Sequence, residues 1–278
     1  MNQIIIVNKP KGITSRDAVN KISKILNTKK VGHNGTLDPL AEGVLVVTTG
    51  KYTKLNNILA SKEKEYIAEV TLGIQTDTLD ITGNILEKKE ETLDIDLLKH
   101  TIQNYKKTYM QEVPKYSAIK VNGKKLYEYA RENIEVELPK KEVTIKDIKL
   151  LSYEKNKFTI MTTVSKGTYI RSLIRDILKD MNQIGTMSKL IRTKQGNFDI
   201  NSSYTLEDIE KGKYKPLKIK DVLDIKTIKV DDKLKFKIQN GVKLDGTYKD
   251  RVLFIDEDDN ELAIYKKEKG KMSVEIML

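Results

Sequence analysis

The sequence predicts an α+β protein whose main part is a mixed, largely antiparallel sheet with flanking helices. Three observations support this prediction. The chain has 278 residues, which is about the length of two domains. Strand-like and helix-like periodicities both occur, but without the strict strand–helix alternation that is typical of parallel sheets. From about residue 226 the pattern changes to short alternating strands.

The chain opens with a short strand and a helix. Ile4–Val7 is an apolar run that predicts a buried strand, and Lys9–Gly12 has the composition of a turn. A helix is expected from Thr14 or Ser15, because Thr14 and Asp17 have the spacing of a capping box. The apolar residues of this helix fall on one face, at Ala18, Val19, Ile22, Ile25 and Leu26.

The middle of the chain alternates between loops, strands and a second helix. Residues 32–43 contain three glycines and a proline, so we expect a loop that leads into a strand at Val44–Thr49. Every second residue of Tyr66–Leu72 faces one side as an apolar residue, which predicts a strand. Two further strands are expected at about 143–153 and 157–165. The helix that follows them has its apolar residues at Ile170, Leu173, Ile174, Ile177 and Leu178.

The last 53 residues are expected to form a small all-β module. Its predicted strands are 234–238, 251–255, 261–265 and 274–277, with an Asn-Gly turn after the first of them. A module of this size rarely buries an adequate core alone, so it should dock on its neighbour. We therefore divide the chain into domains 1–225 and 226–278.

The charge of the chain points to a polyanionic partner. It has 51 basic and 40 acidic residues, a net charge of +11. Residues 226–278 contain 12 basic and 11 acidic residues, so nearly all of the excess lies in the larger domain. Nucleic acid is the partner that this excess favours.

The composition also excludes several classes of protein. Without cysteine there is no disulfide, no thiolate nucleophile and no cysteine-ligated zinc, and His33 and His100 alone are a poor basis for a metal site. We expect no metal and no cofactor. No apolar run approaches the roughly 20 residues of a membrane span, and Ile4–Val7 is too short for a secretion signal, so a soluble, cytoplasmic protein is expected.

The most unusual segment is residues 32–43, with Asp38 directly before Pro39. Proline disfavours helical backbone for the residue before it, so the Asp38 carboxylate should lie on an extended loop that a substrate can approach closely. From the spacing alone, a glycine-rich turn in which Asp38 bonds neighbouring amides is the plainer interpretation.

Several motifs, taken together and in order, resemble the TruB family of bacterial tRNA pseudouridine-55 synthases. The matching segments are Lys9-Pro10-x-Gly12-x-Thr14-Ser15, Gly32-His33-x-Gly35-Thr36-Leu37-Asp38-Pro39-Leu40-Ala41-x-Gly43, Lys64-x-Tyr66, Asp77-Thr78-x-Asp80-x-x-Gly83, Pro114-x-Tyr116-Ser117-Ala118-x-Lys120, Lys166-Gly167-Thr168-Tyr169-Ile170-Arg171 and Leu190-x-Arg192-Thr193. With Gly196 and Phe198, which continue the last of these segments, the matches extend over residues 9–198.

The resemblance implies the pseudouridine synthase fold and the isomerisation of uridine to pseudouridine at position 55, in the T arm of tRNA. No cofactor is needed, because the uracil that leaves the sugar is also the group that returns. It further implies a C-terminal RNA-binding module of the PUA type and a monomer with no obligate protein partner. Asp38 matches the family's nucleophile; attack on the sugar and attack on the base both remain open.

Two more residues match the family's catalytic positions. Arg171 corresponds to the arginine that pairs with the nucleophilic carboxylate and keeps it ionised. Tyr66 corresponds to the tyrosine that stacks on the flipped-out uracil and helps to remove the C5 proton. Considered alone, Tyr66 is more simply an aromatic residue of a strand that faces a core.

The resemblance also implies five substrate-binding residues. Tyr169 and Leu190 should line the uracil pocket, and His33 should position the RNA rather than transfer protons. Asp80 corresponds to a residue that hydrogen-bonds in the pocket or the tRNA arm, although an aspartate turn is its plainer interpretation. Lys9 should contact a backbone phosphate.

An insertion at about 112–140 should close over the tRNA arm. It combines charge with aromatic residues, at Tyr116, Lys120, Lys124, Lys125, Tyr127, Tyr129 and Arg131. The competing function is a non-catalytic RNA-binding or tRNA-folding protein on the same scaffold. A guide-RNA-dependent relative that acts on ribosomal RNA is a further alternative, but such relatives lack this insertion.

Overall fold

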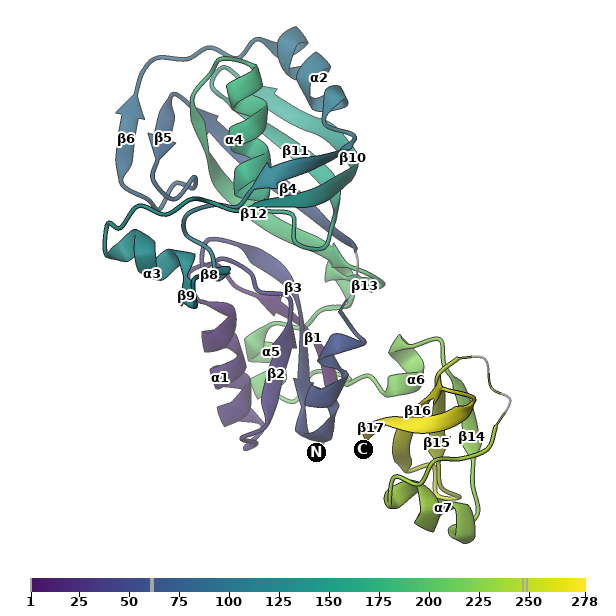
Figure 1. Cartoon of the computed structure of the whole chain (residues 1–278). Coiled ribbons are helices and arrows are strands. Elements are labelled where there is room, and N and C mark those ends of the chain that lie inside the picture. Colours follow the sequence, from purple (N-terminus) through teal and green to yellow (C-terminus); the bar gives the residue numbers. More distant parts are fainter. Residues whose placement is uncertain (1, 61–62, 247, 249) are drawn as a thin grey trace.

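A computed structural model describes residues 2–60, 63–246, 248 and 250–278. Its main feature is a nine-stranded sheet in which β1-β3-β12-β4-β11-β10-β7 is the order of neighbours, while β2 pairs with β3 and β13 with β12 (Figure 1). The strands are β1 (Ile4–Lys9), β2 (Val31–Asn34), β3 (Glu42–Thr49), β4 (Glu63–Leu72), β7 (Thr108–Glu112), β10 (Lys140–Glu154), β11 (Lys157–Ser165), β12 (Gly185–Gln195) and β13 (Phe198–Asp199). Only the β12–β3 pairing of this sheet is parallel among the described strands. The predicted mixed, largely antiparallel α+β sheet is confirmed.

Helices cover the sheet in two groups. α2 (Ile95–Asn104) and α4 (Ile170–Asp180) pack their apolar faces on β4, β10, β11 and β12 and form the largest core. α1 (Ser15–Ile25) and α5 (Leu206–Glu210) pack on β1 and β3. The predicted capping box opens α1, because the Thr14 hydroxyl accepts from the Asp17 amide and the Asp17 carboxylate accepts from the Thr14 amide.

The apolar run at the start of the chain is buried on both faces of the sheet. Ile5 and Val7 point towards α1, whereas Ile4 and Ile6 belong to a second core that includes Leu253 and Ile264 of the C-terminal module. A strand that is covered on both sides reads as continuously hydrophobic rather than alternating. The module is thus part of the packing of the N-terminal strands.

Short elements connect these layers. They are the 3₁₀ helices η1 (Gly50–Asn57) and η2 (Ile200–Ser202), the hairpins β5 (Ile74–Thr76) with β6 (Ile85–Lys88) and β8 (Lys120–Val121) with β9 (Lys124–Lys125), and the helices α3 (Leu126–Arg131) and α6 (Ile219–Val222). No helix among the described residues is long and apolar enough to cross a membrane.

The C-terminal module contains a four-stranded sheet in the order β14-β15-β16-β17 (Figure 1). Its elements are β14 (Lys226–Lys229), α7 (Asp232–Gln239), β15 (Val252–Ile255), β16 (Glu261–Glu268) and β17 (Lys271–Met277). Three of the four predicted strands are confirmed, but the strand predicted at 234–238 is wrong because this segment is helix α7.

The reason for this error lies in the capping residue. Asp231 accepts a hydrogen bond from the Leu234 amide at 2.8 Å and so starts a helix. Leu234 and Ile238, four residues apart, pack into the module's core, whereas Phe236 between them is 70% exposed. The period-two pattern that indicated a strand was therefore accidental.

Candidate active site

The loop at residues 35–41 carries Asp38 between β2 and β3. This loop is shorter than the one predicted at residues 32–43. Residues 32–34 belong to β2 and pair with β3, and β3 begins at Glu42. Ser15 fixes the loop from α1: its Oγ accepts from the Leu37 amide at 2.8 Å and donates to the Leu37 carbonyl at 3.1 Å. Leu37, Leu40 and Ala41 anchor it in the main core. The loop is thus held firmly on both sides of Asp38.

A buried arginine, Arg192, supports the same loop through hydrogen bonds to its backbone. Arg192 is fully buried and donates to the carbonyls of Gly35 (2.8 Å), Thr36 (3.4 Å) and Val44 (2.7 Å). Gly43 lies against it with a φ of +106°, and a Cβ there would come within 2.3 Å of the Arg192 carbonyl oxygen, so only glycine fits. Arg192 therefore positions the loop, a role that the sequence did not reveal.

Lys9 has a different place from the one predicted. It is fully buried, and its Nζ donates to the carbonyls of Pro10 and Ile13, each at 2.8 Å. Burial lowers its pKa to about 8, an effect that the nearby Asp38 carboxylate opposes. The structure thus gives Lys9 backbone carbonyls as partners, and its predicted contact with a phosphate stays a prediction.

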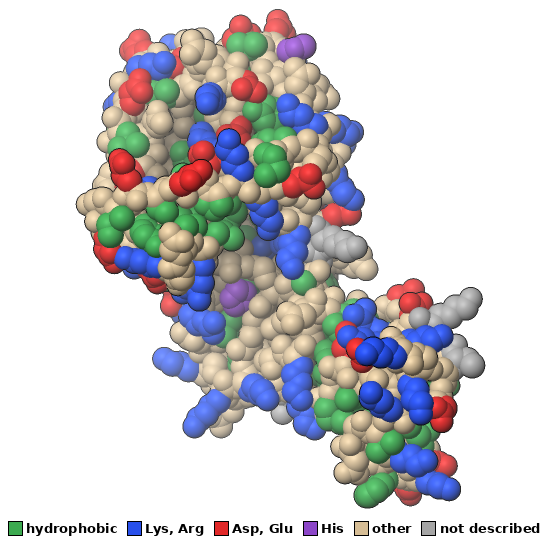
Figure 2. Space-filling model, in the orientation of Figure 1, with side chains coloured by type: hydrophobic (Ala, Val, Ile, Leu, Met, Phe, Trp, Pro, Cys, Tyr) green, Lys and Arg blue, Asp and Glu red, His purple; other side chains and the backbone are tan. Residues whose placement is uncertain are grey.

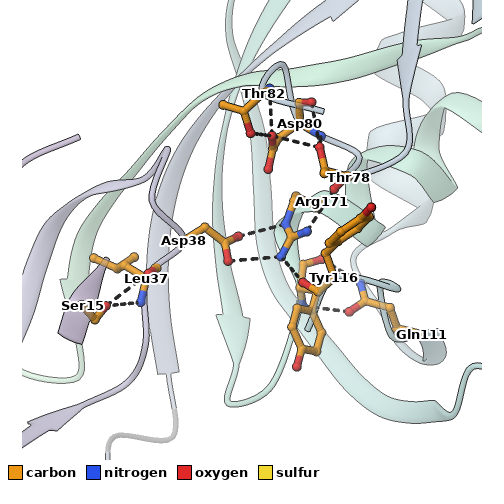
Figure 3. A network of polar contacts seen from close by, with 10 residues as sticks. Ser15, Leu37, Asp38, Thr78, Asp80, Thr82, Gln111, Tyr116 and Arg171 are labelled. Carbon is orange, nitrogen blue, oxygen red and sulfur yellow. Dashed lines mark hydrogen bonds and ion pairs between the residues drawn. The ribbon is translucent and has the colours of Figure 1, made fainter. Parts of the chain in front are cut away.

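Asp38 and Arg171 form a two-point ion pair (Figure 3). Arg171 Nε donates to Asp38 Oδ2 at 2.9 Å, and Arg171 Nη2 donates to Oδ1 at 3.1 Å. The Arg171 side chain is 5% exposed and that of Asp38 is 34% exposed. A buried guanidinium thus fixes a carboxylate that still has open surface, as a nucleophile requires.

The remaining donors of Arg171 tie two other segments to the pair (Figure 3). Nη1 donates to the Thr78 carbonyl at 3.0 Å, and Nη2 donates to the Tyr116 carbonyl at 3.1 Å. The Thr78 loop is itself ordered by Asp80, whose carboxylate accepts from Thr78 Oγ1 and from the amide and hydroxyl of Thr82. The ion pair therefore joins four parts of the chain.

Asp80 acts within this turn rather than on the pocket. It is 6% exposed, and within the described chain it does not belong to the residues that line the cavity beside Asp38. The structure supports the aspartate-turn interpretation, and the predicted hydrogen bond of Asp80 in the pocket or the tRNA arm stays a prediction.

A cavity of about 570 Å³ opens beside Asp38. Tyr66, Tyr169 and Leu190 supply its flat and apolar walls, as predicted, and His33 and Arg171 also line it. Tyr66 is only 7% exposed and also belongs to the main core. It is therefore both an aromatic core residue and part of the cavity wall. Burial raises the pKa of Tyr169, which favours its neutral form. A flat, uncharged base matches these walls.

Gln111 fixes the wall that Tyr169 provides. Its Oε1 accepts from the Tyr169 amide at 2.8 Å, and its Nε2 donates to the Tyr169 carbonyl at 3.2 Å and to the Tyr109 hydroxyl at 2.9 Å. Gln111 is 1% exposed. Because Tyr169 caps α4 two residues before Arg171, this contact positions both pocket residues, and the motifs in the sequence gave no indication of it.

His33 lies on β2 and faces the cavity. Burial lowers its pKa, and the positive charges of Arg16 and Arg192 lower it further, so the ring is neutral at pH 7. Its Nδ1 is buried without a hydrogen-bond partner in the described part of the chain. A neutral ring with free hydrogen-bonding capacity is consistent with the predicted positioning of RNA.

The predicted insertion closes one side of the cavity. Tyr116, Ser117, Ala118 and Tyr127 line it, and Lys125 Nζ and the Arg131 guanidinium lie 5.4 and 5.3 Å from the centre of the Tyr127 ring. In Figure 2 hydrophobic side chains gather over α3, next to Lys and Arg side chains. A surface of this kind suits stacking and backbone contacts with RNA.

Comparison with known proteins gives a consistent result. A family model described as TruB family pseudouridylate synthase (N-terminal domain) matches residues 23–170. A tRNA pseudouridine synthase B of Caldanaerobacter subterraneus subsp. tengcongensis is 44% identical over 247 residues, 88% of this chain and 87% of that protein. Proteins of the same name from Mycoplasma capricolum and Bacillus subtilis are 42% and 40% identical and cover 95% of this chain and 92% and 93% of their own length.

Solved structures share the fold. The crystal structure of a Cbf5-Nop10-Gar1 complex matches with a TM-score of 0.71 at 23% identity, over 99% of this chain and 84% of that one. An H/ACA RNP bound to a substrate RNA containing 2'-deoxyuridine matches with a TM-score of 0.69 at 23% identity, over 99% and 83% of the two chains. At this identity the likeness concerns the fold alone.

Proposed function

This chain belongs to the TruB family of pseudouridylate synthases, and from this premise we propose that it isomerises uridine at position 55, in the T arm of tRNA, with Asp38 as the nucleophile. Membership of the family makes the protein an enzyme that forms pseudouridine. The name that its relatives share, tRNA pseudouridine synthase B, identifies tRNA as the substrate. The T arm and the roles of individual residues are our proposal.

The observation that carries the proposal is the Asp38–Arg171 pair at the edge of a cavity with aromatic walls. A base must leave its stack to reach a carboxylate at this depth, and stacking on Tyr66 and Tyr169 offsets part of the lost energy. The guanidinium holds the Asp38 oxygens in one orientation, so the nucleophile meets its target in a fixed geometry.

The chemistry balances without an external reactant. The bond between N1 of uracil and C1′ of the ribose breaks, a bond between C5 and C1′ forms, the proton leaves C5, and N1 takes up a proton. Asp38 bonds transiently to C1′ or to the base and is released when the new bond is complete. No atom is gained or lost, and no electron is transferred.

The other pocket residues serve this step. Tyr66, which lines the cavity, stacks on the uracil, and its hydroxyl assists removal of the C5 proton. Tyr169 and Leu190 supply further walls of the cavity, and neutral His33 positions the nucleotides around the target. The insertion at about 112–140 covers the tRNA arm.

The organisation of the chain supports further parts of the proposal. Domain 1–225 carries catalysis, and domain 226–278 is a PUA-like RNA-binding module that docks through the core it shares with β1 and β3. The module bears acidic and basic side chains together (Figure 2), so the larger domain supplies most of the attraction to tRNA. We propose that the protein acts as a monomer in the cytoplasm, where its tRNA substrate is found.

The experiment is to incubate the purified protein alone with an unmodified tRNA transcript and to map pseudouridine along it. We expect one pseudouridine, at position 55, without added cofactor or guide RNA. A matched transcript with cytidine at this position should remain unmodified. A product elsewhere in the transcript, or no product from a folded protein, contradicts the proposal.

A further inference from the structure

Lys64 is a cavity residue to which the mechanism gives no role. It lies on β4 two residues before Tyr66, so both side chains point to the same face of the strand, and both line the cavity beside Asp38. The Lys64 side chain is half-buried. It passes close to Gly35, since a Cβ added to this glycine would lie 3.4 Å from Lys64 Cε. Lys166, which follows β11, also lines this cavity, and its charge acts on Lys64.

The charged groups that act on Lys64 are all positive. They come from three neighbouring elements: Arg192 of β12, Lys166 beyond β11 and Lys141 of β10. The two acidic neighbours on β4 are engaged elsewhere, since Glu65 pairs with Lys194 and Glu63 with Lys146. Lys64 forms no ion pair among the described residues. Burial, together with these three cations, lowers its pKa to about 8.

The nearby polar groups do not compensate this charge. Gln195, which pairs with Lys64 across β4 and β12, has a buried Oε1 without a partner in the described structure. Among the described residues, the hydrogen-bond partners of Arg192 are carbonyl oxygens. The carboxylate that lines the cavity, Asp38, is bound to Arg171. A half-buried cation among cations is unfavourable unless an anion comes from outside.

We propose that Lys64 and Lys166 form a phosphodiester site in the cavity, which binds a backbone phosphate of the RNA next to the flipped nucleotide. This inference rests on the proposed function. A nucleotide whose base reaches Asp38 carries its own phosphates to the rim of the cavity, where the ammonium groups act as point charges for them. The site holds the strand while the base is detached from its sugar.

If Lys64 binds a phosphate, the affinity for RNA depends on pH, which is not expected of a lysine with a purely structural role. Free Lys64 loses its proton above pH 8, whereas Lys64 beside a phosphate keeps it. RNA binding then takes up a proton, and the affinity must fall as the pH rises through the pKa of the free enzyme. For a pKa of about 8, the Kd should rise about fivefold between pH 8 and pH 9.

The test measures the Kd of an unmodified tRNA transcript from pH 7 to pH 9 at constant ionic strength, with Asp38→Asn in every protein to prevent turnover. Asp38 is not among the charged groups that act on Lys64, so this background leaves the site intact. We expect Lys64→Met to bind several-fold more weakly at pH 7, with a salt slope smaller by about one and no rise in Kd between pH 8 and pH 9. Lys64→Arg, which stays charged, should bind like the parent at pH 7 and also lose the pH dependence.

Two comparisons keep the proposal open to refutation. Lys189→Met removes an exposed charge next to Leu190 on β12 and should retain the full pH dependence. Lys9, whose pKa is also about 8, is the other candidate for a proton-linked effect. A pH dependence that persists in Lys64→Arg belongs to Lys9 or to another group and overturns the proposal, as does its absence from the parent. Since binding is measured without product, this failure is distinct from the absence of pseudouridine in the wild-type assay.

Discussion

Arg171 donates to both carboxylate oxygens of Asp38, although the two residues are 133 positions apart in the chain. The same guanidinium binds the carbonyls of Thr78 and Tyr116. A planar fork with several donors can join these partners at once, whereas an ammonium group cannot. The orientation of the Asp38 carboxylate therefore depends on the shape of Arg171 as well as on its charge.

Arg171→Lys should separate shape from charge. We expect turnover to fall by about 100-fold or more, because Asp38 loses its two-point support, while the affinity for tRNA changes only a few-fold. Single-turnover kinetics on an unmodified tRNA transcript measure this. Arg175→Lys, one turn further along α4 and bound to Glu112 and Asp176, is the matched control and should stay near wild type. An Arg171→Lys enzyme within tenfold of wild type contradicts the role of the fork.

Tyr66→Phe tests the hydroxyl without disturbing the wall. The ring remains in the core, so the melting temperature and the affinity for tRNA should barely change, whereas turnover should fall by about 100-fold if the hydroxyl handles the C5 proton. Tyr66→Ala should destabilise the fold by about 3–5 kcal/mol as well. If Tyr66→Phe keeps half of the wild-type turnover, the residue is only a stacking surface.

Gln111→Leu should affect catalysis from outside the pocket. It removes both bonds to the Tyr169 backbone, so we expect a loss of stability of about 1–3 kcal/mol and a lower kcat with little change in KM. Gln111→Glu keeps the acceptor for the Tyr169 amide and should recover part of the rate. Thermal unfolding and steady-state kinetics check this. If the Gln111→Leu enzyme loses stability but keeps its kcat, Gln111 does not position the catalytic residues.

The C-terminal module should unfold together with the larger domain, because they share a core. Ile264→Ala is expected to cost about 2–5 kcal/mol and to lower the melting temperature of the whole chain in a single transition. Phe236→Ala, on the exposed face of α7, is the control and should change stability little. A separate early transition in the Ile264→Ala protein would show that the module unfolds independently of the larger domain.

The sequence predicted elements well where local chemistry decides them. The Thr14–Asp17 box starts α1, and alternation over Tyr66–Leu72 marks β4 correctly. It failed at 234–238, where Asp231 as a cap outweighs an accidental period of two. The glycine content of residues 32–43 also led to the wrong prediction of a loop at 32–34. These residues form part of strand β2, whose pairing with β3 depends on contacts between distant segments.

The candidate site shows the same division. Family motifs located Asp38, Arg171, Tyr66, Tyr169 and Leu190, which the structure brings to one cavity. They could not show that Lys9 is buried, that Asp80 orders a turn, or that Arg192 and Gln111 hold the loop and the helix start. These roles depend on burial and on bonds between distant segments, which spacing along the chain does not contain.

The substitution Asp38→Asn tests the central claim most directly. It keeps the size of the side chain and removes the nucleophilic charge. We expect no pseudouridine at position 55 of an unmodified tRNA transcript, with the affinity for that transcript within a few-fold of wild type and an unchanged melting temperature. Formation of pseudouridine by the purified Asp38→Asn protein at a rate comparable to wild type would show that Asp38 is not the nucleophile.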